Sequence, residues 1–246
     1  MAPRRASQPA RAFKLENQRI AVVGSSRGIG LEFAKQLLAR NNEVFAAARD
    51  LEGARDLQAL GKDGSKIHLG QCDTTSLESI KAWVEQTAKQ TDKLDTVFNV
   101  AGKASWGSLM EVDPEELLSL FTVNAVGPLM VVQHLLKAGL LKQGSLVANL
   151  TSKMGAMSDN TSGGTYAYRA SKASLNAITK SLSLDLQDKG ITACVLHPGW
   201  VQTEMVGMRG LITTEESVRG MLNVLEAEGT AINGRMIDYK HDEIGW

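Results

Sequence analysis

The sequence has few cysteines, no long apolar run and no net charge, and each shortage excludes a class of protein. Its 246 residues include only two cysteines, Cys72 and Cys194, which is too few for a disulfide framework and favours a reducing compartment. The longest uninterrupted apolar run is Val44–Ala48, so we expect no membrane-spanning segment and no membrane partner. The cysteines and the four histidines show no metal-ligand spacing, so we expect no metal site.

Charge is balanced in total but not along the chain. The sequence has 27 basic and 27 acidic residues, and its first 14 residues hold four of the basic ones and no acid. The rest is therefore slightly acidic, which argues against a nucleic-acid partner, because such binding depends on basic surface. We interpret residues 1–17 as a basic, disordered tail and expect a cytoplasmic protein. Import into an organelle through a short basic transit sequence is the second interpretation.

Short apolar, β-branched runs alternate with amphipathic segments along the remaining chain. This alternation predicts a single-domain α/β protein over residues 18–246: a doubly wound Rossmann fold with a seven-stranded, mainly parallel sheet and helices on both faces. The expected strands are Arg19–Gly24, Glu43–Ala48, Lys66–Cys72, Leu94–Asn99, Ser145–Leu150, Ile191–Leu196 and Arg235–Asp238. The expected helices lie near 28–40, 51–60, 76–90, 113–139, 165–188 and 214–227.

A glycine-rich turn follows the first expected strand and opens a helix. It reads Gly24-Ser25-Ser26-Arg27-Gly28-Ile29-Gly30. Glycines permit a tight turn and close backbone approach, and the free N–H groups of a helix start attract a pyrophosphate. The turn thus predicts a dinucleotide site, with a simple helix-entry turn that binds nothing as the alternative.

The end of the second expected strand bears on which dinucleotide binds. An acidic residue there would select NAD by hydrogen bonding the ribose, whereas an arginine accommodates the 2′-phosphate of NADP. This chain has Arg49 there and Arg27 in the glycine-rich turn, and two guanidinium groups suit a phosphate. We expect NADP, with NADPH favoured over NADH; the alternative is that these arginines are ordinary surface charges. The neighbouring Asp50 is interpreted as the cap of the next helix.

A tyrosine and a lysine lie four residues apart in the expected helix 165–188. Tyr168 and Lys172 would share one face, with Cβ atoms about 5–6 Å apart. Lowering a tyrosine pKa from about 10 to about 7 requires roughly 4 kcal/mol. An ammonium group about 4 Å away supplies roughly that amount at an effective dielectric constant of 20. The spacing suits an acid–base pair but also occurs by chance on surface helices.

Two further polar residues fall at positions suited to the same chemistry. Ser152 follows the strand ending at Leu150, at the sheet edge where ligands bind, and without a Gly-x-Ser-x-Gly motif it is suited to polarise a carbonyl group rather than to attack it. Asn124 lies four residues before Pro128. Because proline has no N–H, the Asn124 carbonyl loses its helical partner and is free to bind water. A kink needed only for packing is the alternative.

Taken together and in order, these motifs resemble the classical short-chain dehydrogenase/reductase family, within its C-factor and sniffer-like carbonyl reductase branch. The resemblance runs from about Arg19 to Trp246. It rests on the glycine-rich turn, Asn124, Ser152, the Tyr168–Lys172 pair, and on Asp73, Asn99-Val100-Ala101-Gly102 and Pro198-Gly199.

The resemblance implies a role for each matching residue. Tyr168 would donate a proton, Ser152 would orient the substrate carbonyl, Lys172 would also bind the nicotinamide ribose, and the main-chain carbonyl of Asn124 would hold a water in a proton relay. Asp73 would contact the adenine. The cofactor's central region and its carboxamide and phosphates would contact Asn99, Ala101, Gly102, Pro198, Gly199, Val201 and Thr203. Two alternatives remain: Asp73 caps the helix that begins near Ser76, and Asn99 bridges neighbouring strands.

The chain departs from the family pattern in three places. Val23 stands where threonine is usual, and Val100 replaces the second asparagine of the Asn-Asn-Ala-Gly motif. The interval from Ser152 to Tyr168 is 16 residues, longer than usual. We expect the first two departures to affect structural hydrogen bonds and the third to reshape the loop beside the substrate.

The predicted function is NADPH-dependent reduction of a small aldehyde, ketone or quinone to an alcohol, with Tyr168 as general acid. The main alternative is a catalytically quiet NADP(H)-binding regulatory or signalling protein of the same fold. Enoyl-thioester reduction is disfavoured because neither Tyr166 nor Tyr168 has the tyrosine–lysine spacing usual for it. A homodimer or homotetramer is expected. An apolar substrate pocket is expected to involve Trp106, Met154, Met157, Trp200, Met205 and Met208.

Overall fold

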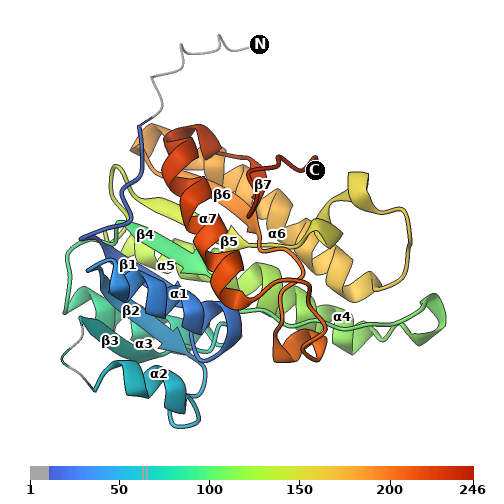
Figure 1. Ribbon diagram of the computed structural model, residues 1–246, viewed down its shortest axis with the longest axis horizontal. Helices are drawn as coiled ribbons and strands as arrows, with labels where there is room; N and C mark the ends of the chain where they lie inside the picture. The colour runs from blue at the N-terminus through green and yellow to red at the C-terminus, as the bar shows by residue number, and fades with distance from the viewer. Residues whose placement is uncertain (1–10, 63, 65) are drawn as a thin grey trace.

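Seven strands form one parallel sheet in the computed structural model, which describes residues 11–62, 64 and 66–246 (Figure 1). The strand order is β3-β2-β1-β4-β5-β6-β7. All six strand pairs are parallel, which confirms the predicted doubly wound fold. The strands are β1 (Arg19–Val23), β2 (Glu43–Ala48), β3 (Ile67–Gln71), β4 (Thr96–Asn99), β5 (Leu146–Leu150), β6 (Thr192–His197) and β7 (Met236–Asp238).

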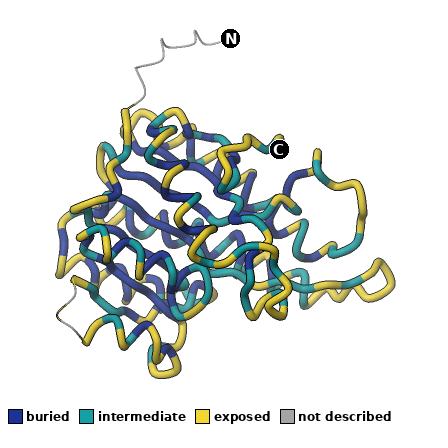
Figure 2. Tube along the Cα trace, in the orientation of Figure 1, coloured by how far each residue is buried: buried dark blue, intermediate teal, exposed yellow. Residues whose placement is uncertain are grey.

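Helices cover both faces of the sheet because alternate strand residues point to opposite sides. Ile20 and Val22 of β1 belong to the core shared with α1, α2 and α7, whereas Ala21 and Val23 belong to the core shared with α3 and α5. The buried part of the chain follows the strands (Figure 2). The helices are α1 (Gly28–Ala39), α2 (Arg55–Leu60), α3 (Leu77–Ala88), α4 (Pro114–Phe121), α5 (Gly127–Lys137), α6 (Tyr166–Asp185) and α7 (Thr214–Glu228).

The second helix begins later than predicted, and Asp50 does not cap it. The Asp50 carboxylate accepts a hydrogen bond from the Gly53 N–H at 3.0 Å, which closes a turn ahead of the helix. The N-cap of α2 is Ala54, without a side-chain hydrogen bond. Asp50 thus stabilises the turn through which the chain leaves β2.

Helices α4 and α5 join into one helical segment, Pro114–Lys137, through a π-type turn over Thr122–Val126. Asp113 caps its start by accepting a hydrogen bond from the Glu115 N–H at 3.1 Å, as the Asp-Pro sequence predicts. The Gly127 N–H bonds the Thr122 carbonyl, five residues back, just before Pro128, which has no N–H to continue the ordinary ladder. The predicted irregularity is therefore present, and Asn124 lies at its centre.

The same segment bears on the expectation that no segment spans a membrane, because a spanning helix must be long and apolar enough to cross the bilayer. Among the described residues, Pro114–Lys137 meets that requirement by length and composition, although 44% of its apolar window is buried. Val131, Val132 and Leu135 of α5 pack in the core against the sheet. Buried core helices satisfy the same criterion, so this is weak evidence for a membrane.

Residues 11–17 are anchored to the domain at Arg11 and Leu15, and the expected boundary at residue 18 stays a prediction. Leu15 is fully buried and belongs to the core beside α1 and α7. Arg11 and Thr230 exchange two hydrogen bonds of 2.8 and 2.9 Å. The rest of the predicted tail, residues 1–10, lies outside the described residues.

Candidate active site

The glycine-rich turn connects β1 to α1 and has the geometry of a phosphate cradle. Gly24 and Gly28 have φ values of +94° and +54°, a region that favours glycine. A side chain at Gly24 would overlap the backbone of Ala101, and one at Gly30 would overlap the Gly24 carbonyl. Arg27, the N-cap of α1, makes no side-chain capping bond. The residues present therefore fit a dinucleotide phosphate, with helix N–H groups to receive it.

The carbonyl oxygen of Val23 ties this turn to the loop after β4. It accepts hydrogen bonds from the N–H groups of both Val100 and Ala101, each at 2.9 Å. Ser25 adds a bond from its buried hydroxyl to the Ala47 carbonyl at 3.0 Å, a role that the sequence analysis missed. Val23 and Val100 are the two positions where the residue type departs from the family pattern. Their backbone groups make the hydrogen bonds between the two loops, so neither residue needs a polar side chain for that purpose.

The two arginines predicted to recognise the 2′-phosphate have different surroundings. Arg27 forms an ion pair with Glu204, which follows Thr203 in the loop after β6. A Cβ atom at Gly28 would lie 3.4 Å from the Thr203 methyl carbon, so that loop lies against the glycine-rich turn. Arg49 is exposed and makes no hydrogen bond or ion pair with the described residues. Its predicted role in binding phosphate stays a prediction.

Asp73 lies after β3 but does not cap α3. Its carboxylate accepts hydrogen bonds from the Thr75 N–H and hydroxyl at 2.9 and 2.7 Å. The helix cap is Ser76, whose oxygen accepts from the Ser79 N–H at 3.2 Å. The capping alternative is therefore wrong, and the assignment of Asp73 to the adenine stays a prediction.

Asn99 bridges strands, as the second alternative proposed. Its amide donates to the Asn149 side chain on β5 at 2.8 Å, and the Asn149 amide donates to the Thr179 hydroxyl on α6 at 2.8 Å. This buried chain links the end of β4 to the helix that carries Tyr168. The Asn99 side-chain oxygen is itself buried and has no partner among the described residues, so an acceptor remains at the edge of the cradle.

The loop after β6 completes the predicted cofactor residues. The Pro198 carbonyl accepts a 2.6 Å hydrogen bond from the buried Ser217 hydroxyl of α7. Gly199 has a φ of +85° and lies against Tyr239 and Ile212. Val201 is buried and pairs with Ile212. The structure thus brings this loop to the carboxyl edge of the sheet, beside the glycine-rich turn.

Tyr168, Lys172 and Ser152 come together at the start of α6. The Ser152 side chain lies close enough to the Tyr168 side chain to lower its pKa. The Lys172 ammonium donates to the Leu150 carbonyl at 2.8 Å and lies 5.9 Å from the centre of the Tyr168 ring. A Cβ atom at Gly102 would lie 3.7 Å from the Lys172 nitrogen. The predicted cluster is therefore contiguous with the Asn99–Gly102 loop.

Burial is the largest influence on the pKa of Tyr168 in this structure, and the expected effect of Lys172 on it stays a prediction. Burial raises the tyrosine pKa, and the Ser152 side chain opposes that rise. Burial also lowers the pKa of Lys172 to about 8. The ammonium donates to the Leu150 carbonyl and lies 5.9 Å from the ring centre, so burial outweighs their attraction. A tyrosine in this state keeps its proton at neutral pH and is suited to be a donor.

The buried ammonium predicts a gain in stability when it is removed. With a folded-state pKa of about 8 against an ordinary 10.5, protonated Lys172 destabilises the fold fully below pH 8, and this cost disappears as pH rises to 10.5. Lys172→Met should raise the free energy of unfolding at pH 7 by about 1–3 kcal/mol, allowing for the lost Leu150 bond.

Denaturant unfolding at pH 7 and pH 10 measures this effect on the protein without cofactor. The difference between Lys172→Met and the unmodified chain should shrink at pH 10. Lys81→Met, at an exposed position of α3, is the matched control and should show no comparable gain. A Lys172→Met variant that is less stable at pH 7, or a gap that does not change with pH, would contradict the argument.

Asn124 is fully buried and fixed by three side-chain hydrogen bonds. Its side chain exchanges two 2.8 Å bonds with the backbone of Lys103 and donates to the Ser171 hydroxyl at 2.9 Å. Ser171 in turn donates to the Tyr168 carbonyl at 2.8 Å. Sequence reasoning missed Ser171, although its position three residues after Tyr168 on a helix was a usable signal. The side chain is thus structural, and the role predicted for Asn124 rests on its main-chain carbonyl.

The long interval between Ser152 and Tyr168 forms two short 3₁₀ turns and a loop that extends beyond α6 (Figure 1). The backbone of Gly155 lies directly against Lys172. Arg169 holds the loop by donating to the Met154 carbonyl at 3.3 Å and to the Ser162 hydroxyl at 3.0 Å. The Ser158 hydroxyl donates to the Gly245 carbonyl at 3.0 Å. The added length is therefore accommodated beside the site without displacing Lys172.

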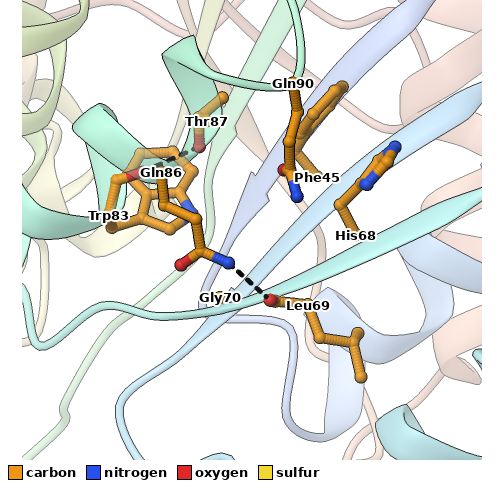
Figure 3. A pocket seen from close by; sticks show the side chains of 8 residues that line it. All are labelled: Phe45, His68, Leu69, Gly70, Trp83, Gln86, Thr87 and Gln90. Carbon is orange, nitrogen blue, oxygen red and sulfur yellow. Dashed lines mark hydrogen bonds between the residues drawn. The ribbon is translucent and has the colours of Figure 1, made fainter.

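A separate crevice between β3 and α3 lies away from this cluster (Figure 3). In it, Phe45 stacks on His68 with ring centres 4.7 Å apart, and Gln86 donates to the Leu69 carbonyl at 3.3 Å. Trp83 lies so close to Gly70 that a side chain there would overlap it. The crevice is narrow and side chains fill it, so it is part of the packing. The described residues include no group of three potential metal ligands.

Comparison with known proteins agrees with this arrangement. Residues 18–210 match the family model described as short chain dehydrogenase. The chain belongs to the short-chain dehydrogenase family. It is 43% identical over 159 residues to C-signal of Myxococcus xanthus, covering 63% of this chain and 95% of that protein. It is 33% identical over 220 residues to 1-hydroxy-2-glutathionyl-2-methyl-3-butene dehydrogenase of Rhodococcus sp., covering 88% and 94%.

Solved structures place this short-chain dehydrogenase in the carbonyl reductase branch. The carbonyl reductase Sniffer of Drosophila melanogaster superposes with a TM-score of 0.87 at 31% identity, covering 94% of this chain and all of that one. The NADPH-bound carbonyl reductase from chicken fatty liver gives a TM-score of 0.87 at 29% identity with the same coverage. The predicted family and branch are thereby confirmed.

Proposed function

We propose that this short-chain dehydrogenase reduces the carbonyl group of a small aldehyde, ketone or quinone with NADPH. The observation that carries the proposal is the Ser152–Tyr168–Lys172 cluster at the carboxyl edge of the sheet, next to the glycine-rich turn. Ligands bind at this edge in doubly wound folds. The NADPH-bound chicken structure supports the choice of cofactor.

In the proposed reaction the bound cofactor supplies a hydride, and the protein supplies position and a proton. The side chains of Ser152 and Tyr168 lie near each other, so one carbonyl oxygen can receive a hydrogen bond from each hydroxyl group. The raised pKa of Tyr168 keeps its proton available until negative charge develops on that oxygen. Tyr168 then donates the proton, and Ser152 holds the oxygen in place.

Lys172 and Asn124 are proposed to support the proton donor. With a pKa of about 8, Lys172 is mostly charged at neutral pH. Its charge favours the tyrosinate that remains after proton transfer and so opposes the rise that burial causes in the Tyr168 pKa. Asn124 lies at the π-type turn, and its side chain holds Lys103 next to Gly102. Its main-chain carbonyl is proposed to return a proton through water.

Steady-state oxidation of NADPH at 340 nm with a panel of aldehydes, ketones and quinones tests the proposal. We expect turnover with at least one carbonyl class. One carbonyl group should be converted to an alcohol for each NADPH oxidised. The competing function is a quiet NADP(H)-binding signalling protein, which the 43% identity to C-signal favours. Tight NADPH binding without turnover of any carbonyl compound would support that function and contradict ours.

A further inference from the structure

Trp106 occupies an unusual place for a tryptophan. Its indole lies in the loop after β4, with its ring centre 5.8 Å from that of Tyr168 and the two planes inclined by 51°. Trp106 is 55% exposed to solvent. Large aromatic side chains ordinarily bury much of their surface. Here the surface left open adjoins the proposed proton donor.

The loop that carries Trp106 is fixed at both ends. Before the indole, the Lys103 N–H and carbonyl both bond Asn124 at 2.8 Å. After it, the Gly107 carbonyl accepts from the Thr165 N–H at 2.8 Å, which joins the loop to the residue preceding α6. Because the loop is already fixed before a ligand binds, little conformational freedom of its backbone is lost when a ligand stacks on the indole.

The reaction geometry places the substrate beside this ring. A carbonyl oxygen bonded by Ser152 and Tyr168 brings the group attached to the carbonyl carbon alongside the Tyr168 ring. Among the described residues, Trp106 is the one whose aromatic ring contacts the Tyr168 ring. The exposed part of the indole at that distance suits a flat, conjugated partner, since aromatic pairs attract beyond the effect of buried area alone.

We infer that Trp106 is a specificity-determining residue that selects carbonyl compounds bearing a planar aromatic ring. The inference rests on the proposed function, because it requires the carbonyl to be bound by Ser152 and Tyr168. It goes further by naming the side chain that discriminates between substrates and the substrate class that it favours.

A pair of aldehydes that differ in ring planarity tests the inference. Benzaldehyde and cyclohexanecarbaldehyde have similar size, and each variant is compared with the unmodified enzyme on the same substrate, which cancels their different reactivity. Trp106→Leu should lower kcat/KM for benzaldehyde about 5- to 10-fold and change that for cyclohexanecarbaldehyde less than about 2-fold. Trp106→Phe should keep most of the benzaldehyde activity.

The division between kcat and KM gives a second readout. If the stacking is equally strong in the bound substrate and in the transition state, its removal raises KM and leaves kcat unchanged. Met110→Ala is the matched control, because Met110 lies four residues further along the same connection and is 91% exposed. It should change neither substrate's kcat/KM.

The outcomes separate the two proposals. Equal losses for both aldehydes in Trp106→Leu, or a Trp106→Phe variant no better than Trp106→Leu, would overturn the role of Trp106 while leaving the reductase intact. Failure of the unmodified enzyme to oxidise NADPH with any carbonyl compound would overturn the proposed function and this inference with it.

Discussion

Replacing Tyr168 with phenylalanine should lower the turnover of carbonyl substrates by about 10²- to 10⁴-fold, the range expected for loss of one general acid. The ring and its contact with Trp106 remain, so the substitution removes only the hydroxyl that is proposed to donate the proton. Affinity for NADPH should stay within a few-fold of the original value, because the glycine-rich turn lies on β1 and α1. Stopped-flow reduction and NADPH fluorescence titration measure the two quantities.

Tyr166 supplies a matched control on the same helix. It is 41% exposed and lies two residues before Tyr168, so its side chain leaves α6 in another direction. Tyr166→Phe should keep turnover within about 2-fold of the original, in contrast to the loss expected for one general acid. Comparable activity in Tyr168→Phe and the unmodified enzyme would show that another group donates the proton.

The second large effect concerns the choice between NADPH and NADH. Arg49→Asp removes an exposed guanidinium at the end of β2 and introduces a carboxylate, which repels a 2′-phosphate and accepts hydrogen bonds from a ribose. Hydrogen bonds to charged groups contribute about 1.5–3 kcal/mol. The ratio of kcat/KM for NADPH to that for NADH should therefore fall by roughly 10- to 100-fold.

The charge change itself must be separated from loss of the phosphate contact. Arg55→Asp makes the same change six residues later, at the exposed first turn of α2, and should leave the ratio nearly unaltered. Parallel kinetics with both cofactors decide the matter. If Arg49→Asp and Arg55→Asp give the same ratio as the original chain, Arg49 does not read the 2′-phosphate, and Arg27 becomes the remaining candidate.

Much of the architecture is readable from the sequence because local patterns determine it. All seven strands were placed to within about two residues, since each is a short apolar run between helical segments. The Asp113-Pro114 sequence likewise indicates where α4 begins, and the structure shows the helix starting there. The start of α2 was misplaced because the Asp50 turn resembles a cap in sequence but closes on Gly53.

The site is only partly readable, because its energetics depend on contacts distant in sequence. The Tyr168–Lys172 spacing predicted their proximity, but not that burial would dominate both pKa values. The pairing of Arg27 with Glu204 joins residues that are 177 positions apart. No local pattern identifies such a partner, and the same holds for the contact between Trp106 and Tyr168.

The carbonyl oxygen of Val23, which serves both Val100 and Ala101, has a consequence for mechanics. A single main-chain atom sets the spacing between the glycine-rich turn and the loop that leads to the cluster of Ser152, Tyr168 and Lys172. Any drift of one loop relative to the other would break two bonds at once, so the two ends of a bound dinucleotide share one fixed reference point. Because no side chain takes part in either bond, the link does not depend on a polar residue at Val23, Val100 or Ala101.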